Sequence, residues 1–80
     1  MIRVVSVAPQ NDHHLLLGFT NGERRLFDVR PYLDKGIFVE LRDLRYFKEA
    51  RVVFGTVQWP HEQDFAPETL YAESKEVTLA

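Results

Sequence analysis

"HHLLLGFTNGERRLFDVR", residues 13–30, is the stretch that decides how this chain folds. Apolar residues alternate with other residues on both sides of Asn21-Gly22. An Asn-Gly pair between two such runs is the strongest short-range signal for a β-hairpin. The sequence therefore predicts two antiparallel strands, over residues 13–20 and 23–30, joined by a tight turn.

Two registers of this hairpin are compatible with the turn. A two-residue loop pairs Thr20 with Glu23. A three-residue loop pairs Phe19 with Glu23 and places Gly22 in the left-handed region, as a G1 bulge. We favour the three-residue loop because it aligns most apolar side chains of the two strands on one face of the sheet. In that register Arg25 also falls on the apolar face, since a shift by one residue exchanges the two faces.

The segments on either side of the hairpin complete a small sheet with short helices. Further strands are predicted over residues 2–8, 51–54 and 56–59, and helical turns over residues 31–36, 44–49 and 67–74. Asp43 is the expected N-cap of the second helix, and Pro67 occupies the first position of the third. The junction at Gly55 is so short that a bulge or a single bent strand fits as well as a hairpin. The expected fold class is α+β, with a small antiparallel sheet of about four to five strands and short helices packed on one face.

Length and composition limit the classes of protein to which the chain can belong. Its 80 residues are expected to make a single domain, residues 1–80, in which residues 75–80 are a loose or edge-paired tail. The net charge of −2 creates no basic field for nucleic acid. The absence of cysteine excludes disulfides and thiolate nucleophiles, and fits a cytoplasmic protein. We expect neither a signal peptide at residues 1–10 nor a membrane span, which needs roughly 20 apolar residues.

Side chains that could carry out catalysis do not fall into a recognised motif. His13 and His14 are adjacent on a predicted strand, so they point to opposite faces and cannot readily share a metal. The segment H-E-Q-D at residues 61–64 lacks the second histidine of H-E-x-x-H, because Phe65 stands in its place. The serines lie outside any G-x-S-x-G elbow, and the glycines are isolated. We therefore expect no catalytic residues, no metal ligands and no cofactor.

Residues 59–71, WPHEQDFAPETLY, gather the only tryptophan with a histidine, acids and two prolines. The order of residue types is typical of a strand end, a turn that begins at Pro60, and a helix that begins at Pro67. Its apolar residues are expected to tie these elements to the core: Trp59, Phe65, Leu70 and Tyr71. Asp64 is expected to hold the turn by accepting hydrogen bonds from nearby backbone amides. The exposed part of the loop would then be His61, Glu62 and Gln63.

Two hairpin arginines, Arg24 and Arg25, are the other candidates for a contact surface. Together with neighbouring arginines they would form a basic patch of the kind that binds nucleic acid. Acidic residues are interleaved with them, however, which is typical of a solvated surface of mixed charge. We therefore predict an interaction surface, rather than a nucleic-acid site, from these residues: His61, Glu62, Gln63, Arg24 and Arg25.

Four motifs in order along the chain resemble a small bacterial family. They are L-x-L-x-F-x-N-G-E, F-D-V-x-P-Y-L, G-x-F-x-x-L-R-D-x-x-x-F and V-x-W-P-x-x-x-D-x-x-P-E-x-L-Y. The family is the domain of unknown function number 2442, and the resemblance covers about residues 4–71. One departure is that the family often has Asn-Gly after Trp-Pro, whereas this chain has His61-Glu62 at an unchanged spacing.

The resemblance implies a compact α+β fold and no established catalytic residues. Some relatives carry a helix-turn-helix domain after this module, and others are encoded beside a second small protein, in an arrangement similar to that of toxin–antitoxin pairs. The leading hypothesis is therefore a non-enzymatic module that binds a small protein partner, as an antitoxin-like or regulatory protein, or that forms a homo-oligomer. The alternatives are a nucleic-acid-binding accessory domain and, less favoured, a metal-dependent hydrolase that uses His61, Glu62 and Asp64. No contact with a membrane is expected.

Overall fold

The computed structural model describes residues 1–77 of the 80-residue chain. The strands are β1 (Val4–Pro9), β2 (His14–Phe19), β3 (Arg24–Asp28), β4 (Arg51–Val53), β5 (Thr56–Gln58) and β6 (Lys75–Glu76). Two 3-10 helices, η1 (Arg30–Tyr32) and η2 (Gly36–Arg42), precede the α-helices α1 (Leu44–Phe47) and α2 (Pro67–Glu73). The predicted α+β class is confirmed. Among residues 1–77, no helix is both long enough and apolar enough to cross a membrane.

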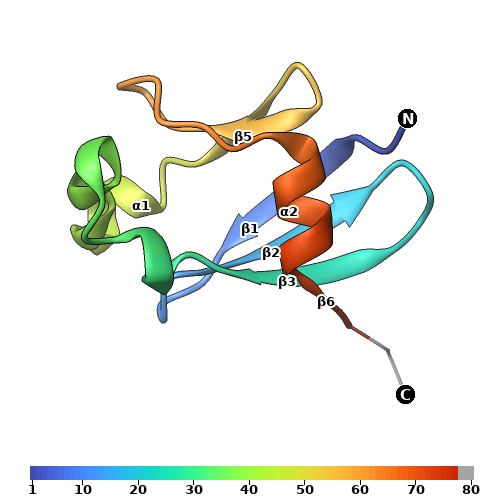
Figure 1. The fold of residues 1–80 in the computed structure, drawn as a ribbon, viewed down its shortest axis with the longest axis horizontal. Helices are drawn as coiled ribbons and strands as arrows, with labels where there is room; N and C mark the ends of the chain where they lie inside the picture. The colour runs from blue at the N-terminus through green and yellow to red at the C-terminus, as the bar shows by residue number, and fades with distance from the viewer. Residues whose placement is uncertain (78–80) are drawn as a thin grey trace.

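The main sheet has four antiparallel strands in the order β1-β2-β3-β6 (Figure 1). The β2–β3 hairpin has the three-residue loop, since the backbone N–H of Phe19 donates to the carbonyl of Glu23 at 3.0 Å. The N–H of Gly22 donates to the carbonyl of Phe19, also at 3.0 Å, and Gly22 has φ +87°. The favoured register is therefore confirmed, and a left-handed glycine closes the turn.

A second, two-stranded sheet is formed by β4 and β5, which pair Val53 with Thr56. The loop between them is only Phe54-Gly55, and both residues have positive φ, at 50° and 77°. Two left-handed residues in a two-residue loop define a type I′ turn. Residues 51–58 are thus a true hairpin, and neither a bulge nor a single bent strand.

The α-helices begin where the sequence predicts, at Leu44 and Pro67, whereas the 3-10 helix η2 (Gly36–Arg42) was not predicted. The carboxylate of Asp43 accepts a hydrogen bond from the backbone N–H of Arg45 at 3.0 Å, so Asp43 is the N-cap of α1. Helix α2 has Pro67 in its first turn. The predicted tail is paired with the sheet edge at residues 75 and 76, and residues 78–80 lie outside the described part of the chain.

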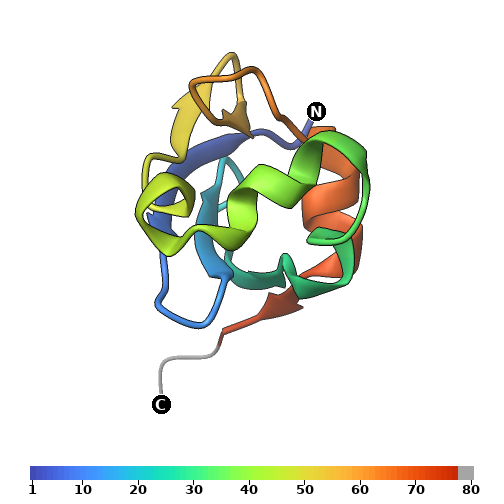
Figure 2. The same cartoon turned by 90° about the vertical axis from the view of Figure 1, so that its left-hand side faces the viewer.

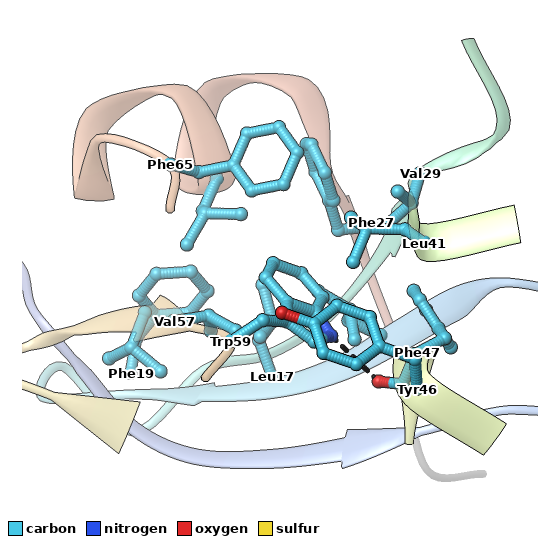
Figure 3. Packing of buried hydrophobic residues seen from close by; sticks show 13 residues of the cluster. Leu17, Phe19, Phe27, Val29, Leu41, Tyr46, Phe47, Val57, Trp59 and Phe65 are labelled. Atoms are coloured by element: carbon cyan, nitrogen blue, oxygen red, sulfur yellow. Dashed lines mark hydrogen bonds between the residues drawn. The ribbon is translucent and has the colours of Figure 1, made fainter. Parts of the chain in front are cut away.

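The core lies between one face of the main sheet and the layer formed by the helices and the β4–β5 hairpin (Figure 2). Alternate residues of β2 are buried, which is the pattern of a sheet with one covered face. Trp59 is fully buried at the centre, and its indole N–H donates to the backbone carbonyl of Phe47 at 2.8 Å (Figure 3). The predicted core residues Trp59, Phe65 and Leu70 are buried, and Tyr71 is half-buried.

Candidate functional site

The turn after Trp59 repeats the geometry of the first hairpin. The backbone N–H of Trp59 donates to the carbonyl of Gln63 at 2.9 Å, and the N–H of Glu62 donates to the carbonyl of Trp59 at 2.9 Å. The same two bonds close the loop at residues 20–22. Glu62 stands where Gly22 stands in that loop, and it has φ +72°. The turn therefore keeps the shape that Asn-Gly would favour, with a glutamate forced into the left-handed region.

The prediction that Gln63 is exposed is wrong, because its side chain is only 2% exposed. Its amide oxygen accepts from the hydroxyl of Tyr46 at 2.7 Å. Its amide nitrogen donates to the backbone carbonyl of Ile37 at 3.1 Å and to the carboxylate of Glu40 at 2.8 Å. A buried amide with partners on both ends is stabilising, whereas an unpaired one would be costly. Gln63 therefore holds the turn against η2 and α1.

His61 completes a closed ring of hydrogen bonds around this glutamine. Its backbone N–H donates to the hydroxyl oxygen of Tyr46 at 2.8 Å, and its imidazole stacks on the Tyr46 ring with centroids 5.1 Å apart. Nδ1 of His61 lies 2.6 Å from a carboxylate oxygen of Glu40. The imidazole is therefore engaged with η2 and α1. In residues 1–77 no group of three or more His, Cys, Asp or Glu side chains is placed to hold a metal ion.

The structure also differs from the expectation for Asp64. Its side chain is exposed, and the residue contributes a backbone bridge to Gln58. Within the described chain, no backbone amide donates to the Asp64 carboxylate. The neighbouring Gln63 holds the connection instead, because its longer, neutral side chain reaches across to two other elements.

Arg25 points to the covered side of the sheet, as the register requires. Its Nε donates to the hydroxyl of Ser74 at 2.8 Å, and one terminal nitrogen donates to the backbone carbonyl of Ser74 at 2.7 Å. The other terminal nitrogen lies 2.7 Å from the carboxylate of Glu23, and the guanidinium lies 4.4 Å from the centre of the Tyr71 ring. The fork and planar face of an arginine match this set of partners, which a lysine could not contact together.

The partners of Arg25 also act on one another. The hydroxyl of Tyr71 donates to the Glu23 carboxylate, and this bond, with a smaller contribution from Arg25, lowers the pKa of Glu23 below its ordinary value. The same bond raises the pKa of Tyr71. The ion pair and the hydrogen bonds in this cluster therefore connect α2 and β6 to β3. Arg25 stabilises the fold and does not form part of an exposed contact surface.

The five residues predicted to share an interaction surface do not come together. Gln63 is buried and Arg25 is turned inward. Arg24 is exposed on β3 beside the β2–β3 turn, at one end of the long axis of the molecule, whereas the 59–63 turn lies at the other end (Figure 1). His61 and Glu62 therefore do not form one local surface with Arg24.

Phe54, which the sequence analysis assigned to a strand end, projects from the surface. It is 93% exposed and has φ +50° at the tip of the β4–β5 turn. Its backbone carbonyl accepts a hydrogen bond from the guanidinium of Arg3 at 3.3 Å. The sequence signal that could have indicated this turn is Gly55 between two short runs rich in β-branched residues, 51–53 and 56–58.

A shallow apolar pocket of about 270 Å³ lies beside the N-terminal segment. It is lined by Met1, Ile2, Pro67, Glu68 and Tyr71. In both views the N-terminal residues run next to the start of α2, on the side of the molecule that carries the β4–β5 turn (Figures 1 and 2). The pocket and Phe54 therefore flank the same short segment.

Comparison with known proteins places the chain in one family. The family model described as Protein of unknown function (DUF2442) matches residues 4–76, so the chain belongs to this family. The match extends past the segment recognised in the sequence and includes β6. No curated protein and no solved structure matches the chain.

Proposed function

We propose that this member of the DUF2442 family is a non-enzymatic protein-interaction module whose contact is centred on Phe54. The observation that carries the proposal is the combination of strain and exposure at this residue. Phe54 is 93% exposed in a left-handed conformation that a bulky side chain rarely adopts. Backbone outliers of this kind cluster at binding sites.

The energies of the two states support this assignment. A left-handed conformation costs a residue other than glycine about 1–2 kcal/mol. In the isolated domain Phe54 recovers none of this, because its ring has almost no contact with the protein. Full burial of a phenylalanine side chain is worth about 1.5–3 kcal/mol, which is enough to offset a strain of this size. The residue therefore favours a state in which a partner covers the ring.

The geometry gives less support to the two alternatives. A basic patch on the hairpin is weakened, because Arg25 is turned inward and Arg30 pairs with Asp28 at 2.9 Å. A metal-dependent hydrolase would need His61 free to act with nearby acids, yet its ring is held by Tyr46 and Glu40. We further propose a cytoplasmic setting, in keeping with the lack of cysteine. An antitoxin-like role would be one form of the interaction that we propose.

The test is retention of partner proteins from the native cell by the tagged domain and by Phe54→Asn. Asn-Gly is the preferred sequence for a type I′ turn, so this variant should fold at least as well as the parent. Ile37→Asn, which removes another exposed apolar side chain at a distant site, is the matched control. We expect Phe54→Asn to lose the proteins that the parent and Ile37→Asn both retain. Equal retention by all three would contradict the proposal.

A further inference from the structure

We infer that the domain forms a symmetric dimer in which the Phe54 ring of each copy enters the pocket beside the N-terminal segment of the other. This inference rests on the proposed function, in which Phe54 is a contact residue, and it names a second copy of this chain as the partner. Such a contact is self-complementary, as a two-fold interface requires, because each surface carries both a projecting ring and a receiving pocket.

The pocket matches the ring in size and character. Its volume is about 270 Å³, and four of its five lining residues present apolar or aromatic groups: Met1, Ile2, Pro67 and Tyr71. A closed cavity of about 150 Å³ is enough to bind benzene. The phenyl group of Phe54 therefore fits with room for the walls to adjust, and it exchanges contact with water for contact with apolar atoms.

The ring and the pocket lie close enough together for one copy to present both of them to a second copy. Ile2 lines the pocket, and the next residue, Arg3, reaches the turn by its bond to the carbonyl of Phe54. The backbone N–H of Val4 then donates to the carbonyl of Gly55 at 2.8 Å, which fixes the N-terminal segment against the turn. A two-fold axis that runs alongside the exposed side of this segment, between the two copies, would place each ring over the pocket of the other copy.

Other apolar side chains around this segment would widen the contact. Among the described residues, the exposed large hydrophobic side chains include Met1 and Phe54, which both lie on or beside the N-terminal segment. Single exposed hydrophobic residues are ordinary, but neighbouring ones next to an apolar pocket mark an interaction surface. A small domain also has a narrow margin of stability, which burial of this group in a dimer would increase.

The charges at the two ends of the contact are opposite. Arg3 lies beside Phe54, and Glu68 lies at the pocket. Within residues 1–77 neither side chain forms an ion pair in the single chain. In the dimer, Arg3 next to the inserted ring approaches Glu68 of the other copy. Complementary charges at the rim of an interface select the partner and its orientation.

The dimer is tested by sedimentation velocity from low to high micromolar concentration, together with thermal unfolding at the lowest concentration. We expect the parent and Ile37→Asn to pass from monomer to dimer over this range. Phe54→Asn should raise Kd by at least about a hundredfold, because two rings lose their apolar burial. Its melting temperature in the dilute, monomeric state should be no lower than that of the parent, so that loss of the dimer cannot be assigned to misfolding.

The charge pair gives a second, independent measurement. Arg3→Glu should weaken the dimer by like-charge repulsion against Glu68, and the combined change Arg3→Glu with Glu68→Arg should restore it. A parent that stays monomeric at every concentration would overturn the dimer, as would a Phe54→Asn protein that dimerises like the parent. If the parent is monomeric and Phe54→Asn still loses another protein, the proposed function holds with a different partner. If Phe54→Asn changes neither property, the proposed function fails as well.

Discussion

Replacing Glu62 with glycine should stabilise the domain. Glu62 has φ +72° in a turn whose two closing hydrogen bonds match those of the loop that ends at Gly22. Relief of the left-handed conformation is worth about 1–2 kcal/mol. The greater freedom of glycine in the unfolded chain offsets about 0.4–1 kcal/mol of this. Since the Glu62 side chain is exposed, little else is lost, and the net gain in the free energy of unfolding is about 1 kcal/mol.

This gain can be measured by urea unfolding and by calorimetry. A change of about 1 kcal/mol should raise the melting temperature by roughly 4–8 °C in a domain of this size. Glu62→Ala is the control, because it removes the same carboxylate but keeps a side chain at positive φ, and its stability should stay close to that of the parent. Gly22→Ala, at the corresponding position of the other loop, should lose a similar amount. If Glu62→Gly were no more stable than Glu62→Ala, the assignment of strain to this residue would be refuted.

Three further predictions concern the buried polar groups and the tyrosines. Gln63→Leu should lower the free energy of unfolding by about 1–3 kcal/mol, measured in urea. The hydroxyl of Tyr46 and the carboxylate of Glu40 would each lose the hydrogen bond that Gln63 provides. Arg25→Lys should speed hydrogen exchange in β6, since an ammonium cannot bridge the same groups, whereas Arg24→Lys should leave it unchanged. The bond to the Glu73 carboxylate, aided by desolvation, raises the pKa of Tyr32 to about 12, so absorbance titration should show one tyrosine ionising near that pH. Because the folded pKa is the higher one, this stabilisation is complete below the ordinary value of 10.0 and is lost as the pH rises toward 12, and Glu73→Gln should bring the Tyr32 titration back down.

The elements that local chemistry determines were predictable from the sequence. Asn21-Gly22 between alternating apolar residues predicts both the hairpin and, through the side-chain faces, its register. Asp43 and Pro67 mark the starts of α1 and α2, because capping and proline geometry act within a few residues. The buried residues of the β2–β3 hairpin followed from the same alternation, whereas the core residues Leu41 and Tyr46 were not predicted.

The features that the sequence did not reveal depend on distant contacts or on exposure. Gln63 is buried because Tyr46 and Glu40, which lie 17 and 23 residues away, satisfy its amide. Sequence patterns assign polar residues to the surface by default, so a buried amide is found only when its partners are placed. Phe54 shows the opposite error: an apolar residue at the end of a predicted strand is expected to point into the core, but its side chain is exposed. A type I′ turn placed it outside.

The position of Arg25 has a consequence for the chain while it is being synthesised. Its partner Ser74 lies 49 residues further on, and the strand that covers the edge of β3 follows Ser74 directly. At a synthesis rate of about 5–20 residues per second, the edge of β3 stays unpaired for about 2–10 seconds before β6 has been made. Open edges invite pairing with other nascent chains, and a charge that points inward from the strand discourages it. Arg25, which later binds Ser74 near the end of the chain, therefore also reduces aggregation of the growing chain until Ser74 has been synthesised.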